Sequence, residues 1–262
     1  MANQYFLDQL GRKITSHCPP QRIISLVPSQ TELLFALGLE NEVVGITKFC
    51  IHPKAWFQSK TRIGGTKDVN LERVRALRPD LVIANKEEND AAQVAALAAE
   101  SPVWVSSVDD LNSALSMIGS IAALTDRQEI GAHLCHTITR EFAGLRPACT
   151  KSVVYIIWNE PLMAAGPDTF IHDMLRRCGF SNCIAQLRYP TVLEETLEQL
   201  APQVILLSSE PFPFSNKHVK VMEHRFPASR IVLVDGEMFS WYGSRLTLAP
   251  AYFQKLQDEL NG

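Results

Sequence analysis

The strongest constraint in this chain of 262 residues is a segment that occurs twice. Residues 70–84 read NLERVRALRPDLVIA, and residues 193–207 read LEETLEQLAPQVILL. A shift of 123 positions carries Glu72 onto Glu195 and superimposes the two prolines. In each copy apolar residues spaced for one helix face precede the proline, and an uninterrupted aliphatic run follows it. This order predicts a helix, a break and a buried parallel strand, written twice.

A second pair of segments supports the duplication. Residues 22–28 (RIISLVP) and 152–161 (SVVYIIWNEP) are apolar strands that end in proline. Each precedes a predicted helix that ends before a glycine, Gly38 or Gly179. Further predicted strands are Val43–Ile46, Val103–Val105 and Ile231–Val234. The chain is therefore predicted to be an α/β protein with two similar Rossmann-like lobes.

A long helical tract separates the two repeats. Thr125 and Gln128 form a capping-box pattern, and the apolar stripe that follows predicts a helix of about 20 residues, roughly 30 Å long. We therefore expect lobes in residues 1–107 and 151–262 and a helical connector in residues 108–150. Two lobes on one stiff helix imply a ligand cleft between them.

Charge and hydropathy exclude two classes of protein. A formal net charge of −3 does not suit the basic face of a nucleic-acid binder. No apolar stretch approaches the roughly 18 residues that a membrane-spanning helix needs. Residues 1–20 lack the order of basic, apolar and small residues that marks a secretory signal, so the chain is expected in the cytoplasm if Met1 is the true start.

The cysteines do not form a recognisable framework. There are six, too few and too scattered for a disulfide scaffold, and none forms a C-x-x-C pair. Cys178 and Cys183 are close enough for a bridge, although buried free thiols are the better prediction. The six are Cys18, Cys50, Cys135, Cys149, Cys178 and Cys183.

Motifs for catalysis and metal binding are incomplete. The sequence has no G-x-S-x-G, no G-x-G-x-x-G after the first strand and no H-E-x-x-H. Residues 64–67 (GGTK) lack the earlier glycine of a phosphate loop. Cys50, His52 and His172 do not make up a convincing set of three or four metal ligands. We expect no enzyme activity, no bound cofactor and no direct metal ligation.

Three stretches carry a resemblance to a known family: RIISLVPSQTELLFALGL, NLERVRALRPDLVIA and FSWYGSRL. They resemble ABC importer substrate-binding proteins whose lobes are joined by one backbone helix, the helical backbone metal receptors. The cobalamin-binding members are the most similar, and iron-siderophore and haem binders are related. The resemblance runs from about Arg22 to the C-terminus. It implies a monomeric periplasmic or cell-surface protein that captures a metal chelate (a corrinoid, ferric siderophore or haem-like molecule) and delivers it to a permease dimer.

The resemblance also implies a role for the repeated glutamates. In that family a glutamate on each lobe docks onto arginines of the importer, and the matching positions are Glu72 and Glu195. A carboxylate accepts a bidentate guanidinium, so two fixed carboxylates would set the register on a two-fold partner. The alternative is local, because glutamate in the first turn of a helix is favoured by the macrodipole whatever its partner.

The same resemblance places the ligand against loops at the carboxyl ends of strands in both lobes. These loops carry several aromatic residues, which suit a large flat ligand, although core packing explains any single aromatic equally well. The predicted ligand-binding residues are Phe49, His52, Thr66, Lys67 and Asn85 in the first lobe, and Trp158, Tyr189, Trp241, Tyr242 and Arg245 in the second.

The sequence departs from the cobalamin binders at several of these positions. Two tryptophans of those proteins correspond to Thr66 and Asn85, a third corresponds to Tyr189, and a phenylalanine corresponds to Leu162 or Met163. With Lys67 and Lys86 nearby, the first lobe favours an anionic or oxygen-rich ligand, such as a ferric chelate, over cobalamin. A cytoplasmic sensor or carrier on the same fold is the alternative, and an enzyme is a less favoured one.

Overall fold

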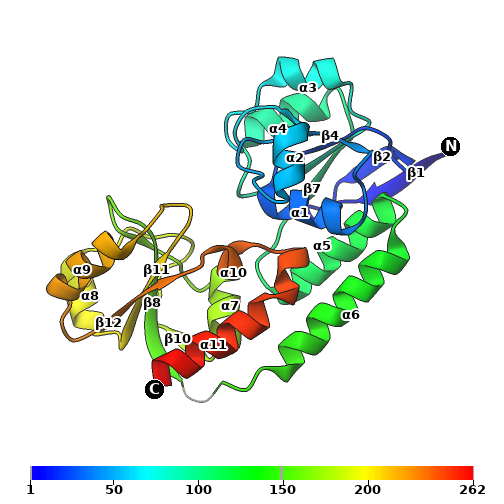
Figure 1. The fold of residues 1–262 in the computed structure, drawn as a ribbon. Helices are drawn as coiled ribbons and strands as arrows, with labels where there is room; N and C mark the ends of the chain where they lie inside the picture. Colours follow the sequence, from blue (N-terminus) through cyan, green and yellow to red (C-terminus); the bar gives the residue numbers. More distant parts are fainter. Residues whose placement is uncertain (1, 148–149, 262) are drawn as a thin grey trace. The chain divides into compact units, whose positions relative to one another are not determined.

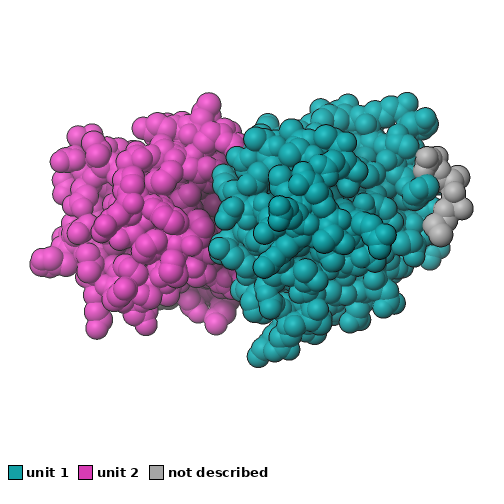
Figure 2. Space-filling model, turned by 90° about the horizontal axis from the view of Figure 1, so that it is seen from above, with its two compact units in different colours: residues 1–108, 112–137, 242–245 teal, residues 109–111, 138–241, 246–262 magenta. Residues whose placement is uncertain are grey.

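A computed structural model describes residues 2–147 and 150–261, so Cys149 lies outside the described part. The chain divides into two compact units, which Figure 2 colours separately. Unit 1 comprises residues 1–108, 112–137 and 242–245, and unit 2 comprises residues 109–111, 138–241 and 246–262. The division falls inside the connector, and a short segment near the C-terminus belongs to unit 1.

Unit 1 is built on a five-stranded parallel sheet with the strand order β5-β4-β3-β6-β7. All five residues of β6 are buried, as expected for a strand covered on both faces. Its strands are β3 (Ile23–Ser25), β4 (Val43–Ile46), β5 (Thr61–Arg62), β6 (Leu81–Asn85) and β7 (Val103–Ser106). Its helices begin with α1 (Pro28–Ala36), α2 (Lys54–Ser59), α3 (Leu71–Leu77) and α4 (Ala91–Ala98), which Figure 1 labels.

Unit 2 repeats this arrangement with the parallel order β10-β8-β11-β12, and β9 pairs antiparallel with β8. The central strands are again β8 (Lys151–Trp158) and β11 (Val204–Ser208). The remaining elements are β9 (Met163–Ala164), α7 (Phe170–Arg177), β10 (Phe180–Asn182), α8 (Glu194–Leu200), α9 (Asn216–Arg225), β12 (Arg230–Val234), α10 (Glu237–Ser240), the 3-10 helix η1 (Ser244–Thr247, which spans the end of the unit 1 segment) and α11 (Ala249–Asn261).

The predicted repeat of helix, break and strand is confirmed, whereas the second pair of predicted strands, 22–28 and 152–161, is observed as β3 and β8 with unequal lengths. Helices α3 and α8 are displaced by 123 positions at both ends, and so are strands β6 and β11. Both helices end on a residue in the left-handed conformation, Arg78 at φ 46° and Ala201 at φ 42°. Non-glycine residues rarely adopt this conformation, so the shared ending is a specific feature of the duplicated unit.

The connector differs from its prediction. It consists of α5 (Leu111–Leu124) and α6 (Gln128–Gly144), and α6 has 17 residues rather than about 20. The predicted capping box is wrong, because α6 begins at Gln128 itself. The Thr125 hydroxyl donates instead to the carbonyl of Ile121 at 2.8 Å and so closes the preceding helix. Asp126, at φ 57°, then redirects the chain.

An N-terminal hairpin has no counterpart in the sequence-based prediction. Strand β1 (Ala2–Leu7) pairs antiparallel with β2 (Lys13–Cys18). The buried carboxylate of Asp8 organises the turn, accepting from the backbone amides of Leu10 and Arg12 and from the Arg12 guanidinium at 2.7 Å. Gly11 supplies the positive φ of 76°. Asp8 and Gly11 are residue types that favour turns, so they were the sequence signal from which this hairpin turn could have been predicted.

Five cysteines within the described residues are free thiols, including Cys178 and Cys183. Cys178 is buried, as expected for a buried free thiol, whereas Cys183 is half-buried. Burial raises the pKa of the Cys178 thiol, which keeps this side chain protonated and inert.

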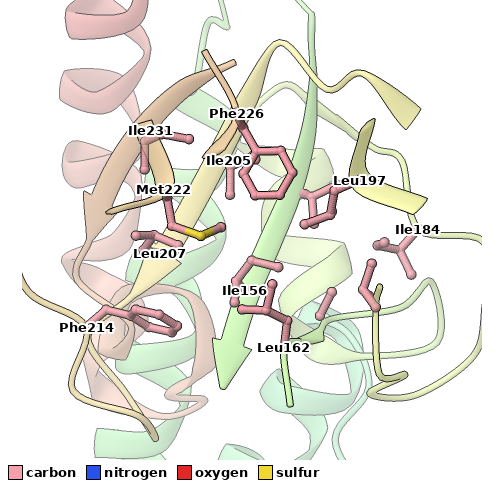
Figure 3. Close-up of a cluster of buried hydrophobic side chains, with 13 residues drawn as sticks. Ile156, Leu162, Ile184, Leu197, Ile205, Leu207, Phe214, Met222, Phe226 and Ile231 are labelled. Atoms are coloured by element: carbon pink, nitrogen blue, oxygen red, sulfur yellow. The ribbon is translucent and has the colours of Figure 1, made fainter. Parts of the chain in front are cut away.

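One face of the unit 2 sheet packs under α8 and α9, and Figure 3 shows the side chains that meet there. Alternate residues of the strands, such as Ile156 and Ile205, point into this cluster. Met222 and Phe226 reach it from α9 and the residue after it. The other face is also buried, since Tyr155 packs on Phe239 with ring centroids 5.2 Å apart.

Truncation of Ile205, which is 0% exposed, tests how much this cluster contributes to the stability of the protein. The variant Ile205→Ala should lower the free energy of unfolding by about 2–5 kcal/mol, because it removes buried methyl groups and leaves a cavity. Urea denaturation followed by circular dichroism measures the loss. The matched change Val221→Ala, at a side chain that is 48% exposed on α9, should cost less than about 0.5 kcal/mol. Equal losses would contradict the assignment of this core.

Candidate functional site

The loop after β4 presents an exposed aromatic side chain beside a lysine. Phe49 is 51% exposed, and the Lys48 ammonium lies 5.1 Å from the centre of its ring. The loop is held in place because the Lys48 amide donates to the Gly64 carbonyl at 2.8 Å. A Cβ at Gly65 would lie only 3.4 Å from the Phe49 ring, so the two loops are in close contact.

The loop that carries Thr66 and Lys67 is fixed from both sides. Gly64 has φ 108°, and a Cβ there would lie 2.3 Å from the Asp68 carbonyl, so the turn requires glycine. The Asn89 side chain donates to the Thr66 carbonyl at 2.9 Å. Thr66 is half-buried and Lys67 is exposed.

Asn85 lies where the sequence placed it, at the carboxyl end of β6, but it is only 3% exposed. Its side-chain oxygen accepts from the amides of Glu87 at 2.8 Å and Glu88 at 3.1 Å, and its amide donates to the Ser106 hydroxyl at 3.0 Å. Asn85 therefore shapes a turn that exposes Lys86, and its own polar atoms are used inside unit 1.

His52 is half-buried and precedes a cis proline. Cys50, two residues earlier, is fully buried, with its sulfur 3.0 Å from the Thr31 hydroxyl and 3.1 Å from that of Thr47. Burial raises the pKa of the Cys50 thiol. Among the described residues no three His, Cys, Asp or Glu side chains are grouped to hold a metal ion.

In unit 2 the strand β8 ends at an exposed indole. Trp158 is 41% exposed, and its ring nitrogen donates to the Glu160 carbonyl at 3.1 Å. Its ring meets Phe212 edge to face at 5.6 Å, and Phe212 packs on Phe214 at 4.7 Å. His218 supports both phenylalanines at 5.3 and 5.4 Å. This stack holds Trp158 in one orientation and leaves part of its ring open to solvent.

Tyr189 is half-buried in the same unit. The Arg188 guanidinium lies 5.7 Å from the centre of its ring. That guanidinium also approaches Asp109 at 3.7 Å and Asp168 at 3.6 Å. Tyr189 thus sits beside a charged cluster rather than in an apolar patch.

Trp241 is buried, and its ring nitrogen donates to the Glu210 carboxylate at 2.8 Å. The Ser240 hydroxyl donates to the same oxygen at 2.5 Å. The pKa of Glu210 is raised, first by burial and then by the nearby charges of Glu237 and Asp235, although the two hydrogen bonds oppose this. The polar edge of the indole is therefore used within unit 2.

Residues 242–245 leave unit 2 and pack in unit 1. Tyr242 is buried, and its hydroxyl donates to the Glu88 carboxylate. Arg245 makes a bidentate ion pair with Glu32, at 2.6 and 3.0 Å. Tyr242 and Arg245, predicted as ligand contacts, therefore anchor this segment.

Three carboxylates hold residues 240–245 in place, and sequence reasoning did not predict their contacts. They are Glu32, Glu88 and Glu210. The separation along the chain is 213 positions for Arg245 and Glu32, and 154 for Tyr242 and Glu88. No local motif could have paired them.

Glu72 and Glu195 lie in the first turns of α3 and α8, and both are exposed. Glu72 borders a cavity of about 600 Å³ that is also lined by Asp68, Arg73 and Arg75. The neighbouring Glu194, unlike Glu195, forms an ion pair with Arg225 at 2.8 Å.

Comparison with known proteins identifies the fold. A family profile described as periplasmic binding protein matches residues 23–226. The chain belongs to this family. Its members are substrate-binding proteins, which are not enzymes. No helix in the described residues is long and apolar enough to cross a membrane.

The sequence relatives and the solved structures of the same fold each cover three quarters or more of this chain. A vitamin B12-binding protein of Pectobacterium carotovorum is 27% identical over 245 residues, which cover 88% of this chain and 86% of that protein. A Bacillus subtilis protein named uncharacterized ABC transporter substrate-binding lipoprotein YvrC is 27% identical over 215 residues, which cover 76% of this chain and 67% of that protein. A periplasmic haem-binding protein solved with two haems superimposes with a TM-score of 0.79 at 26% identity, covering 91% and 98%. The vitamin B12-binding protein of Vibrio cholerae gives a TM-score of 0.78 at 20% identity, covering 94% and 99%.

The buried carboxyl of Glu210 makes stability depend on pH. Because its pKa is raised in the folded state, its contribution to stability is fully present below the unfolded pKa, about 4, and is lost as pH rises through the folded pKa. Glu210→Gln cannot titrate, so its stability relative to the parent should increase from about pH 4 to neutral pH. Urea unfolding at both pH values measures this. The control Glu198→Gln removes an exposed carboxyl from α8. A Glu210→Gln difference that does not change with pH would contradict the prediction.

Proposed function

We propose that this protein captures a metal chelate and delivers it to an ABC importer. One observation carries the proposal: each of the two duplicated units presents an exposed glutamate at the same position of the same helix, Glu72 on α3 and Glu195 on α8. The macrodipole favours a glutamate in either first turn, but the same position in both units also suits two matched contacts with a two-fold partner. The relatives named vitamin B12-binding protein and substrate-binding lipoprotein support the same role. We propose that the protein acts as a monomer in the periplasm or at the cell surface.

The ligand proposal rests on the side chains that remain exposed at the carboxyl ends of the strands. Phe49 in unit 1 and Trp158 in unit 2 each have a partly exposed ring. The loop at Gly65 packs against the Phe49 ring, and Phe212 packs against the Trp158 ring. Aromatic faces of this kind bind flat, partly apolar ligands. Asn85, Trp241, Tyr242 and Arg245 are left out of this proposed set because their polar groups already have partners within the units.

Charge favours an anionic chelate among the candidates. Lys48, Lys67 and Lys86 are exposed on the three loops that follow β4, β5 and β6. Backbone and side-chain hydrogen bonds tie these loops together, through Lys48 to Gly64 and through Asn89 to Thr66. Acidic groups share the region, but Glu88 is already bonded by the Tyr242 hydroxyl. Carboxylate or catecholate oxygens of a ferric chelate, or the propionates of a haem, suit such lysines.

Titration with haemin, a ferric catecholate and cyanocobalamin, followed by absorbance, tests the ligand class. Phe49→Ala and Trp158→Ala should each weaken binding of the preferred ligand about tenfold or more, because each removes an apolar contact face. Tyr5→Ala is the matched control, since Tyr5 is 68% exposed on the N-terminal hairpin. If all three chelates fail to bind the parent protein, the proposed ligand class is wrong. If Tyr5→Ala weakens binding as much, the proposed contact faces are wrong.

Charge reversal tests the docking surface. The double variant Glu72→Arg and Glu195→Arg should lower affinity for the importer in nanodiscs about 100-fold or more, because two charge-assisted contacts become repulsive. Chelate binding should stay unchanged. The control double variant Glu129→Arg and Glu198→Arg makes the same change of net charge at exposed glutamates of α6 and α8. Normal affinity in the Glu72 and Glu195 variant would rule out docking through this pair.

A further inference from the structure

A second cavity of unit 1 has a basic lining and no role in the ligand proposal. It has a volume of about 550 Å³ and lies where α2 and α3 end and β5 begins. Three cationic side chains line it, Lys60, Arg62 and Arg73, and none of its lining residues is acidic. We call these three side chains the basic groove.

Among the described residues, the cations of the basic groove pair with backbone carbonyls and not with carboxylates. Lys60 and Arg62 donate to the carbonyls of Glu40 and Phe57, and Arg73 donates to the carbonyl of Arg62 at 3.1 Å. Within the residues that the structure describes, none of the three forms an ion pair. By contrast Arg75, on the same helix, is paired with Glu100 at 2.8 Å. Three like charges on a lining that has no acidic residue create a local field that attracts anions.

The corresponding helix of unit 2 forms without the charge that Arg73 supplies in unit 1. Arg73 corresponds to Thr196 in α8, and Arg75 corresponds to Glu198. Helix α8 has the same length and the same left-handed ending as α3, with no basic residue in its last turn. Formation of the repeated helix therefore does not account for Arg73, and a binding role is the better explanation.

The basic groove is continuous with the proposed docking surface. Arg73 lines both this cavity and the one that Glu72 borders. If Glu72 contacts an importer, as proposed above, the basic groove lies on the side of unit 1 that meets the membrane surface. Guanidinium groups bind phosphate oxygens in a bidentate manner, and anionic headgroups attract basic surfaces of proteins.

We propose that the basic groove binds the phosphate of an anionic phospholipid headgroup. This contact would hold unit 1 at the bilayer beside the importer, and it would add to the glutamate contacts rather than replace them. The inference rests on the proposed function for its biological setting. The contact itself is a property of Lys60, Arg62 and Arg73.

Co-sedimentation with vesicles tests the proposal without an importer. The protein should bind phosphatidylcholine vesicles that contain phosphatidylglycerol and not vesicles of phosphatidylcholine alone. Arg62→Gln with Arg73→Gln should lower the partition coefficient roughly 30-fold. Lys217→Gln with Lys220→Gln is the matched control, since both lysines are exposed on α9, and it should leave the partition coefficient unchanged.

Three outcomes would overturn the proposal. An equal loss in the control variant would mean non-specific attraction. Competition by inorganic phosphate at the concentration of lipid phosphate would mean a site for the free anion. Binding to polyglutamate through Arg62 and Arg73, with no preference for phosphatidylglycerol, would mean a contact with protein. Chelate titration of the same preparation tests the proposed function separately. A failure of lipid binding can therefore be told apart from a failure of chelate binding.

Discussion

Burial of β6 and β11 on both faces is the constraint on which the rest depends. Neither strand has an exposed residue, so helices must cover both sides of each sheet and every connection must cross over. Parallel strands send all their carboxyl ends to one edge, and the loops there carry Phe49, Lys67 and Lys86 in unit 1 and Trp158 in unit 2. The proposed ligand contacts follow from this geometry. The first turn of α3, which carries Glu72, begins at this same edge, because the Asn70 amide donates to the carbonyl of Ile63, just after β5, at 2.7 Å.

The architecture was predictable because its signals are local and repeated. The order of helix, proline and aliphatic run recurs at a spacing of 123, and the structure reproduces it residue for residue in α3–β6 and α8–β11. The hairpin of residues 2–18 was not predicted because its strands, ANQYFL and KITSHC, show neither a regular alternation of polar and apolar residues nor an aliphatic run. The start of α6 was misplaced because a threonine hydroxyl can serve the end of one helix as well as the start of the next.

The candidate site was predictable in outline and less so in detail. The exposed positions, Phe49, Lys67 and Trp158, were expected from the loops on which they lie. Asn85, Trp241 and Arg245 lie on the expected loops too, yet their side chains bind carboxylates, hydroxyls or amides inside the units. A sequence shows which residues follow a strand. It does not show that Glu32 and Arg245, separated by most of the chain, form one ion pair.

The return of residues 242–245 to unit 1 has a consequence for biosynthesis. Glu32 and Glu88 are translated early, but their partners, Arg245 and Tyr242, are added only after residues 109–241. Unit 1 therefore emerges first and is completed last, after nearly all of unit 2 has been translated. The two units mature together rather than in sequence, and a C-terminal truncation before residue 242 deprives the N-terminal unit, not only its neighbour, of part of its structure.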